Sequence, residues 1–192
     1  MVCFDQSSLL IVIIINIKPM DIETLFPGYN IGSIMPDDAA LLQGLIKAIK
    51  PHYIVEIGTY VGTSTLVMAN TLMEIQSTSK IYTVDQNDHE VMDKAKDVGL
   101  DDKIEFFQQD SFEFAKEIVE KLPFIDFIFY DGEPHVDQYL RHFDLLKKKM
   151  KSGGIYAVHD AFSRNDHGVF LERIEESYVT IPTDKGITLI QI

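Results

Sequence analysis

Acidic residues and histidines stand directly after the hydrophobic segments of this chain, where they could bind a ligand or move a proton. The positions are Asp85, Asp110-Ser111, Asp131 with nearby His135, and the pair His159-Asp160. A carboxylate can accept hydrogen bonds from both hydroxyls of a ribose, and an imidazole beside a carboxylate can take up a proton or bind a divalent metal ion. Each residue alone could be a helix cap, but their occurrence after successive segments indicates a ligand site.

A glycine turn follows the first of these hydrophobic segments and completes the series. It spans Glu56 to Ser64 and reads Glu-Ile-Gly-Thr-Tyr-Val-Gly-Thr-Ser. Gly58 and Gly62 allow a tight turn and a close approach of a ligand to the backbone, while the pair Thr63-Ser64 is expected to cap the next helix. Tyr60 is a candidate for the pocket wall. Because ligands of open α/β sheets bind outside the carboxyl ends of the strands, we expect these residues around one pocket.

The elements that must position these residues alternate along the chain from Pro36 onward. Short β-branched runs are separated by longer helical patterns, which is typical of a sheet with crossover helices. We expect strands over 53–57, 80–84, 104–107, 124–130, 155–158, 178–181 and 186–190, and helices over 36–50, 63–73, 88–98, 111–121, 136–150 and 165–176. The connection between the last two strands is too short for a crossover, so these strands should pair antiparallel. The pattern predicts one doubly wound α/β domain.

The composition restricts the partners of the protein. The chain has 17 Lys and Arg against 30 Asp and Glu, a formal net charge of −13. Such an acidic chain would repel a phosphate backbone, so we expect no nucleic-acid partner. Cys3 is the only cysteine, which excludes an internal disulfide and a Cys-based zinc site. The apolar run Leu9–Ile15 is far shorter than the roughly 20 residues that cross a bilayer. We therefore expect a cytoplasmic protein that does not enter the membrane.

The first 35 residues are expected to be an N-terminal extension of a domain that spans residues 36–192. Met20 could itself begin a protein, so residues 1–19 are candidates for a dispensable appendage. The segment Phe26-Pro27-Gly28-Tyr29 could cover the pocket, form a contact in a homodimer, or be a simple tail. These three interpretations stay open at the level of the sequence.

Taken together, the motifs over residues 36–192 resemble those of class I S-adenosylmethionine-dependent methyltransferases. The segment from Glu56 to Gly62 is similar to that family's first motif, in which an acid precedes the glycine turn beneath the methionine part of the cofactor. Asp85 matches the acid that binds both ribose hydroxyls, and Asp110-Ser111 matches the pair beside the adenine. Within the class, Asp131-Gly132 with His135, the pair Gly153-Gly154, and His159-Asp160 resemble the small O-methyltransferase branch.

The resemblance implies a fold, a cofactor and a reaction. The fold is a Rossmann-like doubly wound sheet of seven strands, mostly parallel with an antiparallel C-terminal strand, with helices on both faces. The cofactor is S-adenosylmethionine, whose methyl group goes to a small-molecule acceptor, with a hydroxyl oxygen expected. The implied cofactor contacts are Glu56, Gly58, Tyr60, Gly62, Thr63, Ser64, Asp85, Asp110, Ser111 and Asp131.

Four candidate catalytic residues could activate that hydroxyl: Asp131, His135, His159 and Asp160. Related catechol-type enzymes hold magnesium through three oxygen ligands, to which Asp131, His159 and Asp160 correspond in position. Because magnesium prefers oxygen and manganese tolerates an imidazole, His159 leaves the choice between Mg and Mn open. In the metal-free alternative, His135 or His159 accepts the hydroxyl proton while Asp131 or Asp160 orients the imidazole. We favour the metal site.

Two other classes of function fit part of the pattern. A nicotinamide-dependent oxidoreductase would also use Asp85 for its ribose, but the Gly-x-Gly-x-x-Gly motif is absent because Gly58 is followed by Thr59 and Tyr60. A non-catalytic nucleoside-binding protein is the other alternative, and the polar residues after the fourth and fifth strands weigh against it. The remaining histidines are expected at loops or on helix surfaces: His52, His89, His142 and His167.

Overall fold

Short segments rich in β-branched and aromatic residues form the strands, because such side chains pack well on a sheet that is covered on both faces. The computed structural model describes residues 33–192. Its strands are β1 (Tyr53–Ile57), β2 (Lys80–Asp85), β3 (Ile104–Gln108), β4 (Ile125–Tyr130), β5 (Met150–Val158), β6 (Tyr178–Ile181) and β7 (Ile187–Gln191). Its α-helices are α3 (Pro36–Ile49), α4 (Thr63–Glu74), α5 (Val91–Asp97), α6 (Ser111–Lys121), α7 (Val136–Leu146) and α8 (Asn165–Leu171).

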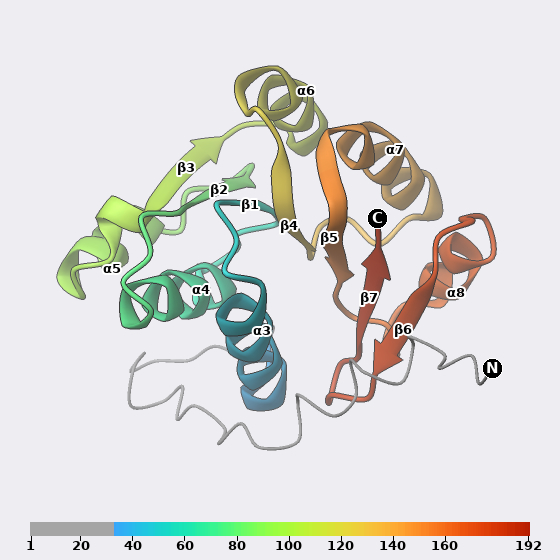
Figure 1. Ribbon diagram of the computed structural model, residues 1–192, viewed down its shortest axis with the longest axis horizontal. Helices are drawn as coiled ribbons and strands as arrows, with labels where there is room; N and C mark the ends of the chain where they lie inside the picture. The colour runs from blue at the N-terminus through green and yellow to red at the C-terminus, as the bar shows by residue number, and fades with distance from the viewer. Residues whose placement is uncertain (1–32) are drawn as a thin grey trace, which may run out of the picture.

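The strands form one seven-stranded sheet in the order β3-β2-β1-β4-β5-β7-β6 (Figure 1). Strands β1 to β5 run parallel, and β7 lies antiparallel to both β5 and β6. The strand order reverses between β1 and β4, which is the point where open α/β sheets bind their ligands. This architecture confirms the predicted Rossmann-like doubly wound sheet, including its antiparallel C-terminal strand.

Helices cover both faces of the sheet, as predicted (Figure 1). Leu42 of α3 and Val67 of α4 belong to the hydrophobic cluster on one face. Phe114 of α6, Phe143 of α7 and Phe170 of α8 belong to the cluster on the other face. Each fully buried side chain of this size stabilises the fold by about 1.5–3 kcal/mol. The two packed layers hold the strands, so the loops at the carboxyl ends of the strands start from fixed positions.

Strand β5 begins earlier than predicted, and helix α7 ends earlier. Met150, expected in the helix, pairs with Ile125 of β4, so the two glycines expected at a helix-to-strand turn lie inside β5. The register of β4 shifts between Ile125 and Phe127. A Cβ on Gly154 would lie 3.0 Å from the carbonyl oxygen of Lys151. The glycines therefore permit an irregularity in the strand where a side chain would be crowded.

Helices α5 and α8 are also shorter than predicted. Before α5, the Asp88 side chain accepts a hydrogen bond from the backbone N–H of Glu90 at 2.8 Å. This turn competes with helix formation and delays the start of α5 to Val91. At the end of α8, the N–H of Arg173 donates to the carbonyl of Phe170, three positions back. This tighter turn ends the helix at Leu171.

The predicted N-terminal extension lies, except for residues 33–35, outside the described residues. The open interpretations of the segment 26–29 and of residues 1–19 therefore stay predictions. Among the described helices, none is long and apolar enough to cross a membrane.

Candidate active site

A cleft of about 390 Å³ opens at the carboxyl ends of the parallel strands. Its lining residues are Ile57, Gly58, Tyr60, Val84, Asp85, Gln86, Asn87, Gln109, Asp110, Ser111, Asp131, Gly132, Glu133, Gln138, Asp160 and Arg164. The cleft therefore joins the loops that follow β1, β2, β3, β4 and β5. Six of the ten predicted cofactor contacts line the cleft. The other four predicted contacts do not line it: Glu56, Gly62, Thr63 and Ser64.

The glycine turn between β1 and α4 is held in left-handed backbone conformations. The φ angles are +93° at Gly58, +47° at Tyr60 and +87° at Gly62. A Cβ on Gly58 would overlap the carbonyl oxygen of Asp131, and one on Gly62 would lie 2.9 Å from a methyl group of Val91. The first glycine thus lets the β1 and β4 loops approach each other at the cleft, while the second lets α5 pack against the turn.

Asp85 at the end of β2 fixes this turn while it faces the cleft. Its Oδ2 accepts a hydrogen bond from the backbone N–H of Tyr60 at 2.8 Å, and its Oδ1 accepts one from the N–H of Asn87 at 3.0 Å. An ionised carboxylate offers about four lone-pair positions. Each Asp85 oxygen therefore keeps acceptor capacity for a ligand in the cleft.

Asp110 caps α6, and Ser111 follows it at the cleft wall. The Asp110 carboxylate accepts hydrogen bonds from the N–H groups of Phe112 and Glu113, which lower its pKa although partial burial opposes them. The Ser111 hydroxyl lies 3.1 Å from Nε2 of His142, whose Nδ1 lies 2.8 Å from the carbonyl of Gln138. An Nδ1–H that donates to this carbonyl leaves Nε2 to accept from Ser111.

The expectation that His142 and His167 lie on the surface was wrong. Their exposed fractions are 1% and 2%. The ring of His142 packs edge-on against Tyr130, and Nε2 of His167 lies 2.7 Å from the hydroxyl of Thr188. Both rings are buried because each finds hydrogen-bond partners inside the protein: His142 on α7 itself and on Ser111 of α6, and His167 on Thr188 of β7.

Glu56 supports the cleft from behind. Its carboxylate is fully buried and accepts hydrogen bonds from the hydroxyls of Ser64, Thr65 and Thr83 at 2.5, 2.5 and 2.6 Å. Burial raises the pKa of Glu56 to about 7, although the hydroxyls oppose this shift. The carboxylate joins β1, β2 and the first turn of α4, and so keeps the glycine turn in place.

The predicted capping role of Thr63 and Ser64 was wrong. Gly62 is the N-cap of α4, and no side chain caps this helix among the described residues. The Thr63 hydroxyl instead accepts a hydrogen bond from Ser33 at 2.6 Å, and Ser64 donates to Glu56. Ser64 belongs to the buried network because the Glu56 carboxylate requires donors, whereas Thr63 pairs with Ser33.

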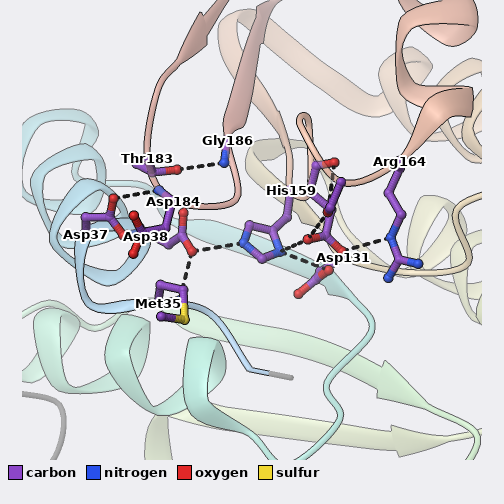
Figure 2. Close-up of polar contacts among 11 residues, drawn as sticks. Met35, Asp37, Asp38, Asp131, His159, Arg164, Thr183, Asp184 and Gly186 are labelled. Atoms are coloured by element: carbon purple, nitrogen blue, oxygen red, sulfur yellow. Dashed lines mark hydrogen bonds and ion pairs between the residues drawn. The ribbon is translucent and has the colours of Figure 1, made fainter. Parts of the chain in front are cut away.

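Asp131, His159 and Asp160 gather at the ends of β4 and β5; Figure 2 shows Asp131 beside the His159 ring. One ligand atom from each of these three side chains lies within 4.8 Å of the others. Nδ1 of His159 lies 3.1 Å from Oδ1 of Asp131 and 3.9 Å from Oδ1 of Asp160. This imidazole is 4% exposed, while Asp131 and Asp160 line the cleft. The structure thus brings together the three residues that the sequence indicated as metal ligands.

A second carboxylate, which the sequence reasoning missed, faces the other side of the His159 ring. Oδ2 of Asp38 in α3 lies 3.1 Å from Nε2 of His159, and its side chain is fully buried (Figure 2). Burial disfavours a charged ring, but the carboxylates of Asp131 and Asp38 outweigh it and raise the pKa of His159 to about 10. At the sequence level Asp38 is an acid in the first turn of a helix, and nothing links it to a histidine 121 positions later.

Asp160 has its own partners on the β5–α8 loop. It adopts a left-handed backbone conformation with φ of +62°. Its carboxylate accepts hydrogen bonds from the Ser163 hydroxyl at 2.7 Å and from Nε of Arg164 at 3.0 Å. Arg164 also lines the cleft and was missed, because it lies in a short loop segment without a motif. These contacts balance the acidic charge at this end of the cleft and fix the Asp160 carboxylate.

His135 lies apart from the cluster that the sequence grouped it with. Its side chain is 70% exposed and stands 3.6 Å from Glu133 and 3.8 Å from Asp166. It is the N-cap of α7, and it is not one of the residues that line the cleft. The geometry gives no support to His135 as the base.

The sheet order, the glycine turn and the acidic cleft define a Rossmann-like α/β protein with a ligand site at its topological switch point. A profile of the family described as Methyltransferase domain (Methyltransf_24) matches residues 55–161, more than half of the chain. The chain therefore belongs to this methyltransferase domain family. The resemblance seen in the sequence is confirmed.

Comparisons with known proteins agree with this assignment. A protein of Arabidopsis thaliana, whose name places it with the caffeoyl-CoA O-methyltransferases, is 30% identical over 122 residues, or 63% of this chain and 51% of that protein. The chain thus spans about half the length of this curated relative.

Solved methyltransferase structures share the fold at low sequence identity. An O-methyltransferase of Bacillus cereus in complex with SAH has a TM-score of 0.72 at 17% identity and covers 97% of each chain. TomG of Streptomyces achromogenes in complex with SAM has a TM-score of 0.66 at 18% identity and covers 97% of this chain and 96% of its own. At such identities the likeness shows the fold alone.

Proposed function

We propose that this protein is an S-adenosylmethionine-dependent O-methyltransferase that acts on a hydroxyl group of a small molecule. The observation that carries this proposal is that one cleft joins the Asp85 carboxylate at the β2 end to Asp131 and Asp160 at the β4 and β5 ends. The first end suits the ribose of a nucleoside cofactor, and the second suits activation of a hydroxyl. Family membership and the SAM- and SAH-bound structural neighbours support the same reaction.

The chain's own residues account for binding of the donor. Asp85 has acceptor capacity for both ribose hydroxyls because each of its oxygens holds one backbone N–H. Gly58 leaves room for close approach, and Asp110 with Ser111 forms the wall expected beside the adenine. S-adenosylmethionine supplies an electrophilic methyl group. The remaining work of the protein is to align the acceptor oxygen with that group and to receive its proton.

The cluster at the β4 and β5 ends fits a divalent metal ion. Nδ1 of His159 is buried and, among residues 33–192, makes no regular hydrogen bond, although Oδ1 of Asp131 lies 3.1 Å away. A nitrogen atom and two carboxylate oxygens that converge in this way form a plausible donor set for manganese, iron or zinc, and a poorer one for magnesium. We propose that Asp131, His159 and Asp160 hold such an ion, which would lower the pKa of the acceptor hydroxyl.

The sequence suggested a histidine base as the metal-free alternative, but the His159 ring is 4% exposed and does not line the cleft, so the metal-free mechanism that we consider uses Asp131 as the base. Asp131 lines the cleft and its Oδ1 stands 3.1 Å from Nδ1 of His159. The carboxylate could therefore take the acceptor proton while the imidazole stabilises its charge. Chelator separates the two mechanisms: activity that falls in chelator and returns with Mn²⁺ supports the metal, and full activity in chelator supports the carboxylate.

Calorimetric titration of the purified protein with S-adenosylmethionine, S-adenosylhomocysteine and NAD tests the cofactor class. We expect binding of the two sulfur nucleosides, whereas binding of NAD alone would indicate the oxidoreductase alternative. A non-catalytic protein could bind the same nucleosides, so the proposed activity also requires turnover. An acceptor panel of catechols, other phenols and sugars, followed by mass spectrometry for the gain of one methyl group, supplies that test.

A further inference from the structure

The imidazole of His159 is locked in one orientation by contacts on all sides. Its backbone N–H donates to the carbonyl of Tyr130 at 3.0 Å, and its ring lies 5.8 Å from the ring of Phe129, centroid to centroid. Asp38 stands at Nε2, and Asp131 stands at Nδ1 (Figure 2). The ring therefore presents one nitrogen to helix α3 and the other to the cleft-lining carboxylates.

Asp38 is itself a fixed group. Its Oδ2 accepts a hydrogen bond from the backbone N–H of Met35 at 2.8 Å, which anchors the carboxylate at the start of α3. The neighbouring Asp37 accepts a hydrogen bond from the N–H of Asp184 at 2.7 Å, which ties the same helix end to the turn between β6 and β7 (Figure 2). The two adjacent carboxylates thus face different partners, and Asp38 alone of the pair reaches His159.

The side on which the imidazole is held decides which nitrogen can bind a metal ion. A carboxylate has no proton to give, so Nε2 must carry the hydrogen in its contact with Asp38. In the neutral ring that a metal ion binds, after the Nδ1 proton has been displaced, the Nε2–H···Oδ2 bond leaves the lone pair of Nδ1 directed toward Asp131 and Asp160. A histidine ligand that donates its other N–H to a carboxylate is a common arrangement in metal sites, because the carboxylate sets the tautomer and the ring angle.

We propose that Asp38 is a positioning residue that holds His159 as the nitrogen ligand of the metal ion through this Nε2–H bond. The proposal rests on the proposed metal-dependent function. It extends the site to helix α3, outside the residues 55–161 that the family profile matches. Asp38 does not line the cleft, so it acts through His159 and not on the substrate.

Binding of Mn²⁺ to the full chain, measured by electron paramagnetic resonance, tests this role without any turnover. Asp38→Ala should weaken Mn²⁺ binding about 10- to 100-fold, as is typical when such an outer partner is removed. Asp38→Asn should retain more affinity than Asp38→Ala, because its amide oxygen can still accept the Nε2–H. Asp37→Asn is the matched control, and it should bind Mn²⁺ like the wild type because it does not touch His159.

A spectroscopic signature separates positioning from a general loss of structure. Mn²⁺ bound to the wild type should show coupling to a ¹⁴N nucleus in electron spin echo measurements. That coupling should vanish in His159→Gln and weaken in Asp38→Ala. If Asp38→Ala fails to fold by circular dichroism, Asp38→Leu, which is similar in size but has no acceptor for the Nε2–H, is compared with Asp37→Leu, and equal Mn²⁺ affinities in these two folded variants would overturn the proposal.

The wild-type protein separates this proposal from the proposed function. If it binds S-adenosylmethionine in calorimetry but takes up no Mn²⁺, Asp38 has no metal ligand to position and the proposal fails, while the methyltransferase assignment stands. If it binds Mn²⁺ without ¹⁴N coupling, His159 is not a ligand and the proposal also fails. If Mn²⁺ binding depends on Asp38 but the sulfur nucleosides do not bind, the proposed function fails instead.

Discussion

Replacement of Asp85 by alanine should weaken binding of S-adenosylmethionine strongly. Each oxygen of this carboxylate already accepts one backbone N–H, from Tyr60 or from Asn87, and each keeps capacity for one ribose hydroxyl. A hydrogen bond to a charged group contributes about 1.5–3 kcal/mol, so the loss of two corresponds to about 3–6 kcal/mol. Since about 1.4 kcal/mol is a tenfold change in affinity, we expect the dissociation constant to rise at least about 100-fold.

Isothermal titration calorimetry with S-adenosylmethionine measures this change. The matched control is Asp88→Ala on the same loop, whose carboxylate accepts the N–H of Glu90 and, among the described residues, does not line the cleft. Its affinity should stay near that of the wild type. If folded Asp85→Ala bound the donor as tightly as Asp88→Ala, the carboxylate would not contact the ribose and the orientation of the donor in the cleft would be wrong.

Two further predictions concern stability. Gly58→Ala should destabilise the fold by about 1 kcal/mol or more in denaturant unfolding, because the φ of Gly58 is +93° and the added Cβ would overlap the Asp131 carbonyl. Gly168→Ala in α8 is the control: a Cβ there meets open space, so this variant should be neutral or more stable than the wild type. His167 is 2% exposed, and burial lowers its pKa from 6.5 to about 4, so the unfolded chain takes up a proton before the folded protein does. The buried neutral ring therefore contributes to stability above about pH 6.5, and this contribution is lost as the pH falls toward 4. The expected loss in the free energy of unfolding is about 3 kcal/mol. His167→Gln should lose correspondingly less stability between pH 7 and pH 4, and equal losses in both proteins would contradict the buried neutral ring.

The strand ends were predictable because their signals are local. The sequence itself marks the apolar runs, the glycine turn and the acids at 85, 110, 131 and 160. Because the carboxyl ends of parallel strands meet at one edge of the sheet, the order of elements places these acids around one site. Asp110, one of the residues that could each be a helix cap, is the N-cap of α6. Seven of the sixteen cleft-lining residues are therefore residues that the sequence predicted for the site.

Contacts between distant segments could not be derived in this way. Asp38 and Arg164 reach the site from a helix and a loop that carry no motif, and His142 and His167 are buried because hydroxyl groups on other elements receive them. Glu56 resembles a cofactor ligand in sequence, yet its buried carboxylate accepts three hydroxyl donors behind the cleft. In each case the partner is set by tertiary packing and leaves no periodic signal.

The absence of a nucleic-acid or membrane partner, a cytoplasmic location and a homodimer also stay predictions of the sequence. The nucleic-acid and membrane predictions rest on the charge of −13 and on the short apolar run, and the homodimer rests on the segment 26–29, which lies outside the described residues. The predicted boundary at residue 36 coincides with the start of α3. Whether residues 36–192 fold as an independent domain is tested with a protein truncated before residue 36.

Transfer of an isotopically labelled methyl group tests the central claim most directly. The wild-type protein is incubated with S-adenosylmethionine that carries a trideuteromethyl group, with Mn²⁺, and with a panel of catechol, phenol and sugar acceptors. We predict that mass spectrometry finds the labelled methyl group on an acceptor oxygen, together with an equal amount of S-adenosylhomocysteine. If the protein binds the donor but no acceptor gains the label, with Mn²⁺ or in chelator, the assignment as a hydroxyl methyltransferase is contradicted.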